Sequence, residues 1–180
     1  MSAMIDVLKF WFSELEPRQW WEKDTQLDQA IGERFGAVHA DASACKLSHW
    51  REDGPGRLAE IIVLDQFSRN IYRDTPQAFA YDGMALILAQ EAIRMGADQE
   101  LDASEKAFFY MPYMHSESMA IHTQALKLFD QPGLEFNLKF ELHHKAIIDR
   151  FGRYPHRNPI LERLSTPEEL AFLTQPNSSF

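Results

Sequence analysis

The stretch RLAEIIVLDQFSRNIY, residues 57–72, decides the fold, because it has the apolar periodicity of a long helix. At about 100° per residue, apolar side chains cover two faces of that helix, so neighbouring helices should wrap around it. Asp65 and Arg69 lie within one apolar stripe, four residues apart, a spacing that lets the carboxylate meet the guanidinium. The sequence therefore predicts a buried ion pair at this helix, flanked by the polar side chains of Gln66 and Asn70.

Helical periodicity recurs along the rest of the chain and is broken at regular intervals. The other expected helices cover residues 4–15, 25–44, 82–96, 102–112, 116–129 and 134–151, with a short last helix beginning at Ser165-Thr166-Pro167. The segment 52–56, EDGPG, is expected to be a break between helices, and Pro112 is expected to interrupt one. Since no alternating apolar run supports a strand, the sequence predicts an all-α fold of about seven or eight helices.

The composition is typical of one globular domain, and we expect a single domain over residues 1–180. Hydrophobic residues make up 45% of the chain and charged residues 25%, which argues against disorder. The net charge of −9 disfavours nucleic-acid binding, and no apolar run approaches the length of a membrane span. No signal peptide is recognisable, and the single Cys45 excludes an intramolecular disulfide, so a cytoplasmic location is the expectation.

A second polar segment covers residues 115–122, HSESMAIH. If it is helical, His115 and His122 share a face but lie two turns apart, about 10 Å along the axis, which is too far for one metal ion. Glu117 would point away from His115, and no familiar metal-ligand spacing or cofactor-binding motif occurs in the chain. We therefore expect no metal and no cofactor.

The third polar segment follows the helix expected at 134–151. Phe136, Phe140 and His144 should lie on the apolar face of that helix. Between residues 150 and 163, four arginines stand against the single glutamate Glu162, a local charge of +3. Arginines around a Gly/Pro turn suit the capture of a carboxylate or phosphate, although they could equally bridge loops and helix ends.

Three interpretations of these polar segments remain open. The candidate ligand-binding residues are Asp65, Gln66, Arg69, Asn70, His115, Glu117, His144, Arg150, Arg153, His156, Arg157 and Asn158. They favour a module that binds a small anion or acidic peptide. The first alternative is a small-molecule enzyme using Asp65, His115, Glu117 or His144 as acid–base groups, which requires convergence on an open cavity. The second is an interaction scaffold in which the polar groups only fix helix register. The ligand and the oligomeric state are not predicted.

Four stretches also carry a family resemblance: residues 64–73, 108–117, 144–158 and 165–169. They resemble the DUF924 family of uncharacterised bacterial proteins over nearly the whole chain. The resemblance implies a right-handed α-α superhelix of stacked antiparallel helix pairs, TPR-like, and no established activity. Ser68 and Tyr154 depart from the family pattern, which usually has Pro and Phe there, and neither departure removes a charged group.

Overall fold

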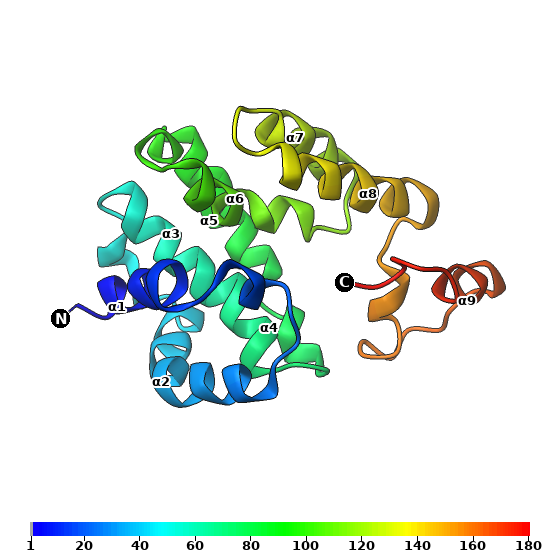
Figure 1. Ribbon diagram of the computed structural model, residues 1–180, viewed down its shortest axis with the longest axis horizontal. Coiled ribbons are helices and arrows are strands. Elements are labelled where there is room, and N and C mark those ends of the chain that lie inside the picture. Colours follow the sequence, from blue (N-terminus) through cyan, green and yellow to red (C-terminus); the bar gives the residue numbers. More distant parts are fainter. Residues whose placement is uncertain (1) are drawn as a thin grey trace.

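The computed structural model describes residues 2–180, and every regular element within that range is a helix (Figure 1). The α-helices are α1 (Ala3–Lys9), α2 (Thr25–Ser43), α3 (Gly54–Ile62), α4 (Ser68–Ile71), α5 (Asp82–Arg94), α6 (Ala103–Met114), α7 (Met119–Phe129), α8 (Glu135–Phe151) and α9 (Pro167–Leu173). Short 3₁₀ segments that the sequence did not predict join several of them, at 17–20, 48–50, 76–79, 97–100 and 155–157. Figure 1 shows α1 and α2 toward one end of the molecule and α9 at the other. The all-α prediction is confirmed.

The helix expected at residues 57–72 is present, but it is wider in the middle than predicted. A π-helical segment, Val63–Phe67, joins α3 to α4 without a change of direction large enough to end the helix. Two side chains donate to backbone carbonyls in this segment: Ser68 Oγ to Leu64 O at 2.6 Å and Arg69 Nη1 to Asp65 O at 2.7 Å. The Arg69 side chain thus folds back onto the π-helical turn that carries Asp65.

The break predicted at residues 52–56 is present but ends earlier than expected, because α3 begins at Gly54. The Asp53 side chain accepts a hydrogen bond from the Gly56 amide at 2.7 Å and caps the helix. Pro55 is tolerated because the first-turn amides of a helix have no intrahelical partner. Gly56 is needed for a different reason: a Cβ there would lie 1.8 Å from the carbonyl oxygen of Trp50.

Gly56→Ala should therefore destabilise the protein by about 1–3 kcal/mol, because the backbone of residue 50 must shift to admit the methyl group. Gly36 is the matched control, since it lies inside α2 with no atom within 4 Å of the added Cβ. Gly36→Ala should instead stabilise by about 0.5–1 kcal/mol through the lower backbone entropy of the unfolded chain. Chemical denaturation of both variants measures the two changes, and equal effects would contradict the close contact.

Two further boundaries differ from the prediction. α6 runs through Pro112 to Met114 instead of stopping at the proline. The next helix, α7, begins only at Met119, so residues 115–118 form a turn. His115 therefore lies at the C-cap of α6, and His122 lies on α7. The shared helical face expected for these two histidines does not exist.

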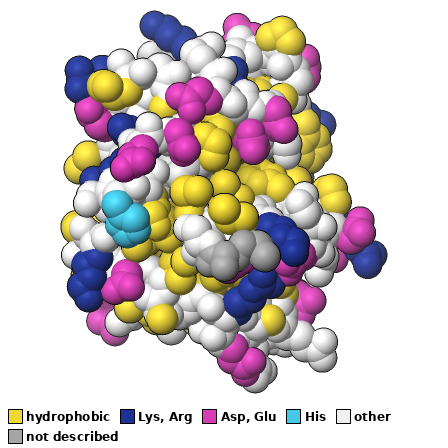
Figure 2. Space-filling view, turned by 90° about the vertical axis from the view of Figure 1, so that its left-hand side faces the viewer, with side chains coloured by type: hydrophobic (Ala, Val, Ile, Leu, Met, Phe, Trp, Pro, Cys, Tyr) yellow, Lys and Arg dark blue, Asp and Glu magenta, His cyan; other side chains and the backbone are white. Residues whose placement is uncertain are grey.

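The hydrophobic core is continuous from α1 to the start of α8, with α3 in its centre. Leu58, Ile61 and Ile62 are fully buried, as the apolar faces of this helix predict. A smaller apolar cluster joins α8 to α9. Figure 2 shows hydrophobic side chains across the middle of the face at the α1 end, among scattered acidic side chains. In the part of the chain that the structure describes, no helix is both long and apolar enough to cross a membrane.

The apolar face predicted for α8 is only half correct. His144 and Ile147 are buried, but Phe136 is 61% exposed and Phe140 is 44% exposed. The rings of these two phenylalanines pack on each other, with centroids 4.8 Å apart. The buried face instead includes Glu141, which hydropathy alone would assign to solvent. α6, α7 and α8 pack on one another in chain order, whereas a regular TPR-like superhelix stays a prediction.

Candidate functional site

The predicted pair of Asp65 and Arg69 is the centre of a larger polar cluster. Asp65 is fully buried, and Arg69 Nη1 lies 3.2 Å from its Oδ1 atom. The same oxygen lies 2.7 Å from Nδ1 of His115, and the Gln66 amide donates to Oδ2 at 2.6 Å. Both oxygens of a carboxylate held in the core are thus hydrogen-bonded, which a buried charge requires. We call Asp65, Gln66, Arg69, Asp82, His115 and Arg157 the central cluster.

Asp82, at the start of α5, provides the second carboxylate. Arg69 donates to it through two parallel bonds, Nη1 to Oδ1 at 2.9 Å and Nη2 to Oδ2 at 3.0 Å. Burial alone would raise the pKa of Asp65, but the Arg69 guanidinium and His115 hold it well below its usual range. Arg69 therefore lies between the carboxyl groups of Asp65 and Asp82 and links the π-helical turn to α5.

His115 is held by Asp65 in a defined orientation. Burial lowers the pKa of His115, and the nearby Arg69 lowers it further, so the ring is neutral at pH 7. Because the ionised carboxylate can only accept, Nδ1 carries the proton and donates to it. Nε2 is then an unprotonated acceptor, and none of the residues 2–180 donates a hydrogen bond to it. This is the arrangement of a carboxylate-oriented general base.

Arg157, in the 3₁₀ segment after α8, is buried with an incomplete set of partners. Its guanidinium lies between two rings, with Cζ 4.6 Å from the Phe79 centroid and 4.7 Å from that of Tyr154. Nη2 donates to the carbonyl of His115 at 3.0 Å, and Nη1 reaches Asp82 at 3.4 Å. Nε is buried and has no hydrogen-bond partner. Burial, followed by the neighbouring Arg69, lowers the pKa of Arg157, as expected for a cation that is short of counter-charge.

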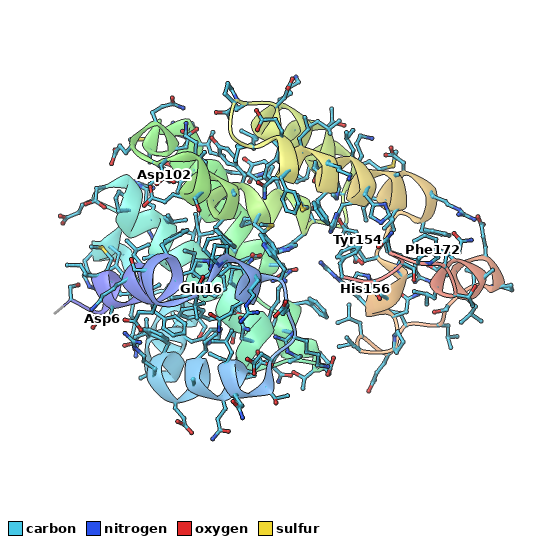
Figure 3. All side chains as sticks on the ribbon, in the orientation of Figure 1. Asp6, Glu16, Asp102, Tyr154, His156 and Phe172 are labelled. Atoms are coloured by element: carbon cyan, nitrogen blue, oxygen red, sulfur yellow. The ribbon has the colours of Figure 1, made fainter. Side chains whose placement is uncertain are left out.

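A ring cluster of His144, Tyr154, His156 and Phe180 adjoins Arg157. The Phe180 ring centroid lies 3.8 Å from that of His144, 4.5 Å from His156 and 5.2 Å from Tyr154. Tyr154 and His156 lie next to each other on the segment that follows α8 (Figure 3). Nδ1 of His156 is a further buried atom without a partner. Two unpaired nitrogen atoms, Arg157 Nε and His156 Nδ1, therefore belong to adjacent residues of one short 3₁₀ segment.

Tyr154 anchors this segment to the helices beneath. Its hydroxyl donates to the carbonyl of Met114 at 2.5 Å and lies 3.2 Å from Nε2 of His122. His122 in turn meets Glu141 of α8, Nδ1 to Oε1, at 2.7 Å. Burial raises the pKa of Tyr154 and also that of Glu141. Tyr154 therefore stays protonated and serves as a fixed hydrogen-bond donor.

The remaining candidate arginines are engaged with glutamates. Arg150 pairs with Glu168, Arg153 with Glu169, and Arg163 with Glu117; these contacts lie between 2.6 and 2.9 Å. The local charge of +3 is thus neutralised by residues from outside the segment. Of the four arginines, Arg157 is the one whose shortest carboxylate contact exceeds 3 Å.

Three candidates have structural contacts away from the central cluster. Asn70 donates to Asp28 at 2.8 Å, on the α2 side of the molecule. Glu117 accepts from the Tyr154 amide at 2.7 Å, in addition to its bonds with Arg163. Asn158 is fully buried and binds Ser165 and Glu169 through its amide nitrogen. Glu117 and Asn158 fix the C-terminal turn, and none of the three side chains converges on Asp65.

The sequence reasoning missed Asp82, Phe79 and Tyr154 as members of the site. The sequence indicates only that Asp82 begins a helix, and no spacing rule connects it to Arg69, which lies 13 positions earlier. Tyr154 stands where the family pattern usually has Phe. Its hydroxyl donates a buried hydrogen bond to the carbonyl of Met114, which a phenylalanine could not form.

Hollows in the surface lie away from the central cluster. One, of about 260 Å³, is lined mainly by the rings of Trp20, Trp21, Phe108 and Phe136. Another, of about 150 Å³, lies between α8 and α9. Neither is lined by a residue of the central cluster. Across residues 2–180, no three His, Cys, Asp or Glu side chains are grouped so as to hold a metal ion.

Comparison with known proteins identifies the family. The family model described as "Bacterial protein of unknown function (DUF924)" matches residues 7–177. The chain belongs to the DUF924 family. The solved structure of a protein of unknown function from Agrobacterium tumefaciens is similar to it, with 38% sequence identity and a TM-score of 0.90 over 96% of this chain and 97% of that one. No curated protein matches the chain.

The buried histidines predict that this DUF924 protein loses stability in mild acid. Burial lowers the pKa of His144 to about 3 and that of His156 to about 4. Unfolding restores values near 6.5, so between about pH 6.5 and pH 4 the unfolded chain binds protons that the folded chain does not. Stability should fall as the pH is lowered through that window, by roughly 1 kcal/mol per pH unit for each histidine.

Denaturant titrations at pH 7 and pH 5 measure this loss. A variant with His144→Gln and His156→Gln removes both groups and should lose less stability than the natural sequence between the two pH values. An equal loss in the two proteins would show that other groups cause the acid sensitivity.

Proposed function

We propose that this DUF924 protein is a binding module for a small anion, and that Arg157 is the residue that holds the anion. One observation carries the proposal: Arg157 is 5% exposed, yet its Nε–H has no acceptor. A guanidinium withdrawn from water needs both counter-charge and hydrogen-bond acceptors. Asp82 supplies little of either, because both of its oxygens are already held by Arg69 at about 3 Å.

The surroundings of Arg157 favour an oxyanion over other ligands. The rings of Phe79 and Tyr154 hold the guanidinium plane, which leaves its edge as the direction in which a ligand can bond. Carboxylates and phosphates match that edge, because two of their oxygens can accept from adjacent N–H groups. Nδ1 of the neighbouring His156 would supply another polar contact.

Thermal unfolding with added inorganic phosphate tests the proposal. A ligand that binds only the folded protein stabilises it by about 2.7 kcal/mol at one hundred times its dissociation constant, which corresponds to a rise of about 5–10 °C in melting temperature for a domain of this size. We expect a saturable rise with phosphate and none with chloride at equal ionic strength. Equal shifts with the two salts would mean a general salt effect and would remove the support for an anion site.

A second candidate function rests on the Asp65–His115 pair. The 2.7 Å contact and the free Nε2 atom are suited to removing a proton from water or from a ligand hydroxyl. The hollows described above reach neither this pair nor Arg157, so binding is preferred to catalysis on the ground of the unpaired Nε–H of Arg157. Incubation with simple aryl esters and aryl phosphates tests it. Catalysis requires turnover that is lost in His115→Gln, and turnover equal in both proteins excludes His115.

The wider expectations from the sequence belong to the same proposal. Stacked antiparallel helix pairs in a right-handed TPR-like superhelix would present the anion site from a rigid frame, and the ligand would be a small molecule or an acidic peptide. A cytoplasmic location fits such a ligand, whereas the acidic net charge disfavours nucleic acid as a partner. If phosphate, simple carboxylates and acidic peptides all fail to bind, the scaffold interpretation, with no small-molecule site, is the better account.

A further inference from the structure

We propose that the ligand of this site carries a flat aromatic ring next to its anionic group, and that Phe180 occupies the place of that ring. The inference rests on the proposed function, since it names the class of anion that Arg157 would bind. It starts from the ring cluster, where the Phe180 ring lies against His144, Tyr154 and His156, and where Tyr154 also contacts the guanidinium.

The rings of His144, Tyr154 and His156 form what we call the ring seat, on which Phe180 packs. The seat is held rigidly, whereas Phe180 itself is half-exposed. Tyr154 is fully buried and His144 is 4% exposed, but Phe180 is 52% exposed. The two buried rings are fixed by hydrogen bonds: the hydroxyl of Tyr154 to Met114 O, and Nδ1 of His144 to the carbonyl of Phe140 at 2.7 Å. A rigid aromatic seat with a half-exposed occupant is suited to exchange one ring for another.

The geometry also connects the ring seat to the anion site. Tyr154 contacts both, because Arg157 Cζ lies 4.7 Å from its ring centroid and Phe180 lies 5.2 Å from the same ring. His156 precedes Arg157 in the chain, and its ring lies 4.5 Å from Phe180 while its Nδ1 is buried and unpaired. A ring in the seat would therefore place an attached carboxylate or phosphate on the side of the unpaired nitrogens.

The seat disfavours a cationic ring. Burial keeps His144 and His156 neutral at pH 7, and the Arg157 guanidinium lies against the Tyr154 ring, so a positive ligand would meet repulsion without a free carboxylate. A neutral ring with an anionic substituent satisfies both halves of the site. Aryl carboxylates and aryl phosphates are the ligand class that this combination favours.

The Phe180→Ala variant tests the binding of a ligand ring independently of the binding of its anionic group. Three probes are titrated against the natural sequence and the variant: inorganic phosphate, methyl phosphate and phenyl phosphate. Removal of the competing ring should strengthen phenyl phosphate binding about tenfold and leave the other two affinities within about twofold. Phe136→Ala is the matched control, because Phe136 is an exposed phenylalanine in the first turn of α8 and does not contact the ring seat. This variant should leave the affinities for all three probes unchanged.

The outcomes distinguish this inference from the proposal on which it rests. If phosphate and methyl phosphate bind but phenyl phosphate gains nothing from Phe180→Ala, the ring seat is refuted and the anion site stands. If phenyl phosphate gains equally from Phe136→Ala, the gain does not come from the seat, and the inference is again refuted. If none of the probes binds either protein, the anion site and the ring seat both fail.

Discussion

Asp65→Ala is expected to lower the free energy of unfolding by about 3–5 kcal/mol, the usual loss when one partner of a buried pair is removed. The carboxylate is fully buried and accepts from three side chains. Without it, the Gln66 amide and the Nδ1–H of His115 are left in the core with no acceptor, each at a cost of about 1–3 kcal/mol. Arg69 would keep its two bonds to Asp82. Denaturant unfolding followed by circular dichroism measures the loss.

Asp149→Ala is the control for this substitution. Asp149 also pairs with a cation four residues away in a helix, Lys145, but its side chain is 42% exposed. We expect a change of less than about 1 kcal/mol there, because surface pairs contribute little. Similar losses for the two variants would contradict the role of Asp65 as the buried acceptor that joins the π-helical turn to α6.

Arg157→Met is expected to abolish anion binding while leaving the fold intact. Removing one partner of a buried, hydrogen-bonded charge pair typically costs about 2–5 kcal/mol of binding energy, so the affinity for phosphate should fall at least thirtyfold. A buried guanidinium whose Nε–H has no acceptor contributes little stability of its own, and methionine can fill the space between Phe79 and Tyr154. The free energy of unfolding should therefore stay within about 1 kcal/mol of the natural value or rise.

Arg150→Met provides the comparison, because Arg150 is 47% exposed and its guanidinium meets Glu168 at the surface. This variant removes the same charge from the same part of the chain and should bind phosphate as the natural sequence does. If Arg150→Met weakens binding as much as Arg157→Met, the attraction comes from net charge and not from a site. If Arg157→Met unfolds the protein, Arg157→Lys keeps the charge and should bind more weakly than arginine.

The sequence was sufficient to predict those contacts that depend on positions close together in one helix. The Asp65–Arg69 pair follows from a four-residue spacing, and the cap of α9 follows from Thr166 and Glu169. The order and approximate positions of the longer α-helices were predicted for the same reason. The π-helical turn was not, because it depends on how the core packs around α3 and α4 and not on a local signal.

Contacts between distant segments could not be predicted. His115 meets Asp65 across 50 positions, and Arg157 reaches Asp82 across 75. Periodicity shows that a histidine or an arginine is buried, but it does not show which helix supplies the partner. The local charge of +3 between residues 150 and 163 was misleading for this reason. Its arginines form ion pairs in the fold with Glu117, Glu168 and Glu169, which lie outside that stretch of sequence.

The most direct test of the central claim is the ¹H–¹⁵N resonance of the Arg157 Nε–H group, assigned by its disappearance in Arg157→Lys. This donor has no acceptor in the structure. If it holds the anion, its proton resonance will move downfield as phosphate is added, and the shift will saturate at the dissociation constant found by thermal unfolding. A resonance that stays in place while phosphate stabilises the protein would contradict the account, because the anion would then be bound elsewhere.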